Sequence, residues 1–142
     1  MKKIILGVCL IAAFASCKKD DDDVTCEVSV TGIAANYKLT KIVTYFPSPL
    51  PDQDITTSIL TGSCEQNGIY QLKSDKTITY TEAAGCGGDD TGSWDIVSGK
   101  ISMNAGSVFL TDVTVSGWDC NTLTLSQEAG SGIGTRYTFS KQ

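Results

Sequence analysis

A hairpin pattern enclosed by two cysteines is the feature that most restricts how this chain can fold. Residues 69–73 and 77–81 alternate apolar and polar side chains, and a polar tripeptide at residues 74–76 separates them. An antiparallel hairpin closed by that turn places Tyr70 opposite Tyr80, on the face that also carries the other apolar side chains. The segment therefore predicts two strands with one buried face.

The cysteines around this hairpin predict two disulfides. Extending the register of the hairpin brings Cys64 opposite Cys86, at a separation that a disulfide can close. Of the six cysteines, Cys9 lies in a predicted signal peptide at residues 1–16, and Cys17, which follows it, is the predicted site of lipidation. Elimination then pairs Cys26 with Cys120, because an even number of cysteines in an oxidising compartment is typical of disulfide bonding.

The same alternation, interrupted by turn residues, continues through most of the chain. Residues 46–54 contain all three prolines and predict a loop, and residues 83–91 predict a second, glycine-rich loop. Residues 24–36 predict a lead-in that forms a short helix or a plug. Besides the central hairpin, the predicted strands comprise residues 37–45, 55–60, 94–97, 100–103, 108–116, 121–127 and 135–140.

Pairing these strands in sequence order keeps large side chains on one face. The two-residue turn Ser98-Gly99 suits a tight hairpin, because glycine accepts a positive φ. The predicted pairs are Trp94 with Met103, Ile96 with Ile101, Val115 with Leu123, Val113 with Leu125, Tyr137 with Leu125, and Phe139 with Leu123. Every link is sequential and antiparallel, so we expect an all-β fold, an up-and-down meander of about eight strands that closes into a barrel.

The first residues predict an export signal rather than a part of the fold. A basic pair, Lys2-Lys3, precedes an apolar stretch at residues 4–14 that is too short to span a membrane as a mature helix. We therefore expect residues 1–16 to be a signal peptide. The sequence Phe-Ala-Ser-Cys at residues 14–17 resembles the lipobox of bacterial lipoproteins, with Phe14 at the usual leucine position. The alternative is an ordinary signal peptide with a chance cysteine.

The lipobox resemblance implies that Cys17 is lipidated and becomes the first residue of the mature protein. Several acyl chains on one residue anchor a protein stably, whereas a single chain is marginal. Residues 17–25 then form a lipidated cysteine with an acidic tether, because the run Asp20–Asp23 is too charged to bury apolar area. Lysines followed by acids also resemble the export tag of some surface lipoproteins of Gram-negative bacteria. The expected location is the outer membrane, facing either the cell exterior or the periplasm.

The residue inventory argues against several classes of function. The chain has no histidine, which excludes a Ser-His-Asp triad and any zinc site with a histidine ligand. Its formal charge of −5 disfavours nucleic acid as a partner. No carboxylate pair is grouped for acid–base chemistry among Glu65, Glu82, Asp89, Asp90, Asp95, Asp112 and Asp119. We therefore expect neither an enzyme nor a cofactor or metal, and a monomer whose partner is the membrane that holds its lipid.

The segment from residue 35 to residue 141 resembles a known family. The resemblance rests on a series of motifs in a fixed order. They are C-x-x-x-x-x-Y-x-L-x-x-D-x-T-x-x-Y starting at Cys64, then Cys86, then Gly-Ser-Trp at residues 92–94. Together with the final strand they are similar to the lipocalin-like domain of bacterial lipoproteins. Tyr37 stands where the wider lipocalin family has a tryptophan after a glycine. The resemblance implies a single lipocalin-like β-barrel domain over residues 26–142 and a non-enzymatic binding role.

The large side chains predicted to point into the barrel are the remaining candidates for a binding site. They are Tyr37, Tyr70, Tyr80, Trp94, Met103, Phe109, Tyr137 and Phe139. In one interpretation they are plain core, because side chains usually fill small barrels. In the other, six of them line a pocket for a small apolar or aromatic ligand: Tyr37, Tyr70, Tyr80, Trp94, Met103 and Tyr137.

The sequence thus predicts a membrane-anchored binding module and leaves two modes of binding open. The first is a small hydrophobic ligand held inside the barrel. The alternative is a solid barrel, an interaction or structural module that meets a protein or a glycan through outer loops such as residues 46–54 or 106–107.

Overall fold

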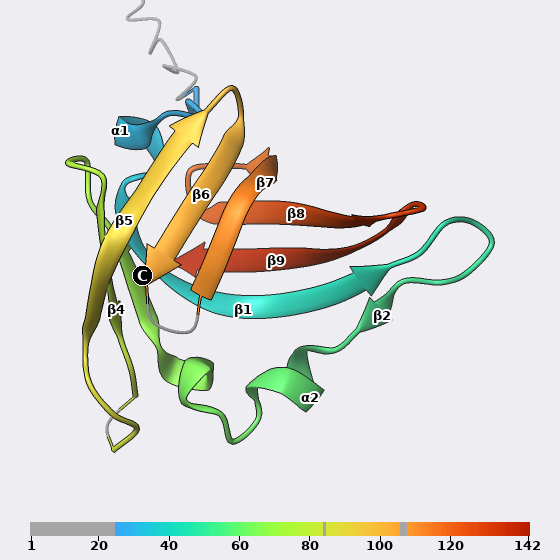
Figure 1. Ribbon diagram of the computed structural model, residues 1–142, viewed down its shortest axis with the longest axis horizontal. Coiled ribbons are helices and arrows are strands. Elements are labelled where there is room, and N and C mark those ends of the chain that lie inside the picture. The colour runs from blue at the N-terminus through green and yellow to red at the C-terminus, as the bar shows by residue number, and fades with distance from the viewer. Residues whose placement is uncertain (1–24, 84, 106–107) are drawn as a thin grey trace, which may run out of the picture.

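The computed structural model describes residues 25–83, 85–105 and 108–142 (Figure 1). The predicted signal peptide, Cys17 and the acidic run lie outside these residues, as does the predicted contact loop at residues 106–107. Within the described residues, no helix is long and apolar enough to cross a membrane.

Strands make up most of the described chain. Nine of them lie in the order β1 (Ala35–Tyr45), β2 (Gln53–Asp54), β3 (Ile69–Leu72), β4 (Thr77–Thr81), β5 (Asp90–Val97), β6 (Lys100–Ala105), β7 (Val108–Trp118), β8 (Thr122–Gly130) and β9 (Ile133–Lys141). The helical elements are short: α1 (Val30–Ile33), α2 (Thr56–Leu60) and the 3-10 turn η1 (Cys64–Asn67). The helix at α1 agrees with the predicted lead-in.

The strands form one antiparallel sheet in the order β2-β1-β3-β4-β5-β6-β7-β8-β9, and β1 also pairs with β9. This extra pairing closes β1 and β3 to β9 into a ring of eight strands, which confirms the predicted all-β meander. β2 is an addition that the sequence did not predict. It comes from the end of the proline-rich loop and pairs with the far end of β1 (Val43↔Asp54).

The predicted registers of the tight hairpins are confirmed. Tyr70 pairs with Tyr80 in the central hairpin, and Trp94 pairs with Met103 in the next one. The last hairpin pairs Leu125 with Tyr137 as expected. Short turns fix these registers locally, so alternation along the two strands was enough to find them.

The register predicted between β7 and β8 is wrong. Val115 pairs with Leu125 rather than Leu123, and Trp118 takes the place opposite Leu123. A bulge between Val115 and Gly117 inserts an unpaired residue into β7 and changes the register by one residue, and the pairs on both sides of it differ from the predicted ones. β7 also runs on to Trp118, into the segment predicted as a turn.

The strand predicted at residues 55–60 is also wrong, because Thr56–Leu60 forms the helix α2. The Thr56 hydroxyl bonds to both backbone groups of Ile42, accepting from its nitrogen at 2.8 Å and donating to its oxygen at 3.2 Å. A side chain therefore occupies the place where a paired strand would continue β2. The backbone nitrogen of Thr56 donates to the Asp54 carboxylate at 3.0 Å, which turns the chain away from β1.

Both predicted disulfides are present. Cys26 is bonded to Cys120 and Cys64 to Cys86, with Cα–Cα distances of 5.2 and 5.6 Å. The route to the second bridge differs from the expected one, because Cys64 lies in η1 and β3 begins only at Ile69. The bridge therefore ties η1 to the loop that follows β4, instead of extending the ladder of the hairpin.

The lengths of the two closed loops predict how much each disulfide contributes to stability. The bridges join residues 94 and 22 positions apart. Chain entropy then gives about 5 kcal/mol for Cys26–Cys120 and about 3 kcal/mol for Cys64–Cys86. We expect the Cys26→Ser/Cys120→Ser variant to unfold at a lower urea concentration than Cys64→Ser/Cys86→Ser. Equal midpoints, or the opposite order, would contradict this ranking.

Candidate functional site

The side chains predicted to line a ligand pocket converge inside the ring. They come from six strands, β1, β3, β4, β5, β6 and β9. Tyr37, Tyr70, Tyr80, Trp94 and Met103 are each at most 2% exposed and belong to one apolar cluster, and the partly buried Tyr137 packs against it. Closure of the ring thus brings together all six predicted residues.

Two of these side chains use their polar atoms to close one end of the ring. The Tyr37 hydroxyl donates to the backbone oxygen of Ile33 at 2.6 Å, at the end of α1. The Trp94 indole nitrogen donates to the backbone oxygen of Lys73 at 2.9 Å, in the β3–β4 turn. Buried polar atoms of these kinds ordinarily find a partner within the protein. Here the bonds hold α1 and the turn in place.

Tyr70 and Tyr80 stack on each other in the middle of the cluster. Their ring centroids are 4.6 Å apart, and Phe139 meets Tyr70 edge-on at 5.6 Å. Gly68 covers the Tyr80 ring so closely that an added Cβ would lie 2.5 Å from the Tyr80 hydroxyl. Neither tyrosine hydroxyl has a hydrogen-bond partner among the described residues. These rings fill space, but their hydroxyls are left unsatisfied.

Phe109, which the sequence placed inside the barrel, points outward and is 71% exposed. The cause is a bulge in β7, where the register with β6 shifts between Ile101 and Met103. Asp112 adopts a φ of +53° at this bulge. Leu110 and Val113 therefore face inward, and the parity of Phe109 is reversed. An aspartate inside an apolar strand pattern is the only sequence signal of such a bulge, because aspartate is depleted in strands and tolerates positive φ.

An open cleft lies on the outer face of β5, β6 and β7. It has a volume of about 290 Å³ and is hereafter called the β5–β7 cleft. Cross-strand pairs set Ser93 beside Asn104, and Asn104 beside Phe109. The outward-facing residues of its lining are Lys76, Ser93, Asp95, Ser102, Asn104, Phe109 and Thr111, and the buried residues Trp94, Met103 and Leu110 complete it.

One ion pair accounts for the charged groups of this cleft. The Lys76 amine lies 2.9 Å from a carboxylate oxygen of Asp95, and the backbone nitrogen of Ile96 donates to the other oxygen at 2.8 Å. The hydrogen bond from Lys76, followed by that from Ile96, lowers the pKa of Asp95. The carboxylate is therefore held ionised beside its cation, and the charges of the lining cancel.

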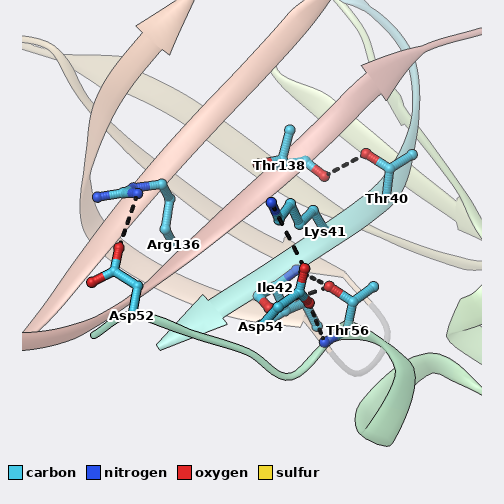
Figure 2. Close-up of polar contacts among 8 residues, drawn as sticks. All are labelled: Thr40, Lys41, Ile42, Asp52, Asp54, Thr56, Arg136 and Thr138. Carbon is cyan, nitrogen blue, oxygen red and sulfur yellow. Dashed lines mark hydrogen bonds and ion pairs between the residues drawn. The ribbon is translucent and has the colours of Figure 1, made fainter. Parts of the chain in front are cut away.

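A second surface feature is the arm formed by the ends of β1, β8 and β9, which projects from the ring in Figure 1. Figure 2 shows how side chains fasten the proline-rich loop and β2 to this arm. Arg136 lies 3.8 Å from Asp52 and Lys41 lies 3.7 Å from Asp54. Arg136 also sits over the Tyr45 ring, 5.4 Å from its centroid. Half-exposed pairs contribute little stability, so they mainly position the loop.

The end of this arm exposes apolar side chains. Leu50 in the loop is 59% exposed and Ile133 at the start of β9 is 39% exposed. A Cβ added at Gly132 would lie 3.3 Å from Pro47, so the loop rests on the turn between β8 and β9. The loop that the sequence named as a contact surface is therefore ordered by contacts to the arm.

The acidic side chains form no group that could hold a metal ion among the described residues. Among the described residues, no three His, Cys, Asp or Glu side chains gather where they could hold a metal ion. Asp95 is bound to Lys76, and Asp119 accepts from the backbone nitrogens of Asn121 and Thr122 in the β7–β8 turn.

Comparison with protein-family models, curated proteins and solved structures finds no match for this chain. The functional interpretation therefore rests on the residues and their geometry.

Burial of the inward tyrosines predicts a loss of stability in alkali. Burial raises the pKa of Tyr37 from 10.0 to about 12, and burial likewise raises the pKa of Tyr70 and Tyr80. Below about pH 10 both the folded and the unfolded chain keep these protons. At higher pH the unfolded chain ionises first, so the free energy of unfolding should fall from about pH 10 to about pH 12. Urea midpoints across this pH range measure the fall in stability. A shallower fall in the Tyr37→Phe variant would show that ionisation of Tyr37 causes part of it. A flat profile would contradict the burial of these hydroxyls.

Proposed function

We propose that the protein is a lipid-anchored, non-enzymatic binding module with a lipocalin-like barrel, and that it recognises its partner on its outer surface. One observation favours a binding site on the outer surface over one inside the barrel. The side chains expected to line an internal pocket pack against each other, and five of the six are at most 2% exposed. A ligand among them would have to displace ring contacts and the bond between Tyr37 and Ile33.

The outer surface, in contrast, carries large apolar side chains that are exposed. Phe109 stands over the β5–β7 cleft, and Leu50 and Ile133 stand at the end of the arm. Large apolar side chains on a surface are individually ordinary, but a cleft with an aromatic ring beside polar groups is typical of binding sites. This supports the solid-barrel alternative drawn from the sequence.

The anchoring part of the proposal rests on the leader and on where the chain enters the fold. The lipobox-like residues 14–17 and the acidic run precede Thr25, the first described residue. The next residue, Cys26, is bonded to Cys120 in the β7–β8 turn. A lipid on Cys17 would therefore hold the ring by this turn, at the outer membrane, facing the cell exterior or the periplasm.

A second candidate function, binding of a small ligand inside the ring, is favoured by the unsatisfied hydroxyls of Tyr70 and Tyr80. A buried hydroxyl without a partner costs roughly 1–3 kcal/mol. A small molecule carrying a hydrogen-bond acceptor next to both rings would recover that cost. This candidate needs the rings to separate, because they stack at 4.6 Å.

Native mass spectrometry separates the two candidates. If recognition is on the surface, the protein purified in detergent should carry its lipid and no further bound molecule. Titration with hydrophobic probes should then leave the fluorescence of Trp94 unchanged, measured in a Trp118→Phe background. A co-purified small molecule, or a saturable response lost in Tyr80→Ala, would favour the internal site.

Fractionation tests the anchor independently of the ligand. The Cys17→Ser variant should lose acylation and move from the membrane fraction to the soluble fraction. Cys9→Ser, a change within the predicted signal peptide, is the matched control and should stay with the membrane. If Cys17→Ser still partitions into detergent with the membrane, the anchor lies elsewhere.

A further inference from the structure

We propose that the β5–β7 cleft binds a neutral saccharide, with Phe109 as the platform on which a sugar ring stacks. This inference rests on the proposed surface recognition and names its site and ligand class. Figure 1 shows β5, β6 and β7 side by side, with no other strand of the ring laid over them.

The exposure of Phe109 is the first step. At 71% it is the most exposed large apolar side chain of the described residues. The bulge at Asp112 produces this exposure, because the unbulged parity would bury the ring. The Asp112 nitrogen donates to the Ser102 hydroxyl at 3.1 Å, so the cleft itself braces the bulge. An aromatic ring that faces water offers a flat apolar surface to the C–H face of a sugar ring.

The polar groups around the ring are the second step. Asn104 lies directly across from Phe109, and Ser93 lies directly across from Asn104. Ser102 follows on β6, and its hydroxyl retains the capacity to donate. One amide and two hydroxyls supply both hydrogen-bond donors and acceptors. Each hydroxyl of a sugar can donate and accept a hydrogen bond, so it can pair with such groups. A purely apolar partner would instead leave these groups desolvated.

Charge is the third step and decides the class of sugar. Lys76 and Asp95 neutralise each other at 2.9 Å, so the cleft presents no unpaired charge to a ligand. The chain as a whole carries a formal charge of −5, which repels acidic glycans. A neutral sugar needs no charged partner in the cleft and is not repelled by the negative charge of the chain. The volume of about 290 Å³ lies at the lower end of ligand sites, which suits a short stretch of a longer glycan.

The test measures binding of the full-length protein in detergent to neutral polysaccharides. Starch, dextran, mannan, xylan and a β-1,3-glucan are cast separately into native gels, with polygalacturonate as the acidic comparison. At least one neutral polymer should retard the protein, and polygalacturonate should not. Phe109→Ala should weaken that retardation roughly tenfold or more in apparent Kd, and Phe109→Tyr should preserve it.

The matched control is Val97→Ala, which removes another exposed apolar side chain, 66% exposed, at the β5–β6 turn. It should bind as the unsubstituted protein does. Circular dichroism of each variant confirms that the fold is retained. The proposal is overturned if no neutral polymer retards the protein, if Phe109→Ala binds equally well, or if only polygalacturonate is bound. A dimer in sedimentation velocity that Phe109→Ala dissolves would also overturn it, by assigning the face to a second copy. None of these results bears on the internal ligand, which native mass spectrometry decides separately.

Discussion

The pairing of β1 with two different neighbours is the constraint on which the rest of the structure depends. β1 meets β3 at Tyr37↔Tyr70 and meets β9 from Tyr37 to Tyr45, so it joins β3 to β9 and closes the ring. β2 then covers β1 where β3 has ended. Between the residues of β1 that pair with β3 and those that pair with β2, the short helical elements η1 and α2 lie against the strand. The aromatic cluster and the closing bonds of Tyr37 and Trp94 follow from this closure.

Bulges decide which side chains the closed ring turns outward. Because the side-chain period of a strand is two, each inserted residue reverses the parity of the later residues in its strand. Register shifts occur in β1, in β7 twice, and near the end of β8. The shift at Asp112 lies between Leu110 and Val113, so both of these residues are buried and Phe109, next to Leu110, is exposed. The inward Leu110 and the outward Phe109 of the β5–β7 cleft are thus two consequences of one backbone feature.

Local features were predictable from the sequence, and features that depend on distant partners were not. The hairpins at Tyr70–Tyr80 and Trp94–Met103 follow from alternation around a short turn. Helix α2 could not be anticipated, because Thr56 bonds to Ile42, which is distant in sequence. The five buried side chains of the candidate pocket were correctly placed inside, whereas Phe109 was not, since its parity depends on one φ angle at Asp112. The β5–β7 cleft needs that same register, so sequence reasoning missed it.

The most direct test of this account is thiol labelling at Phe109 and Leu110, two neighbouring positions whose orientation depends on the bulge at Asp112. Phe109→Cys and Leu110→Cys are each treated with a maleimide reagent in the folded protein and again in denaturant. The account predicts that Phe109→Cys labels in the folded state at a rate close to that in denaturant, while Leu110→Cys labels only when the protein is unfolded. Protection of Phe109→Cys together with ready labelling of Leu110→Cys would contradict it, because Phe109 would then belong to the interior.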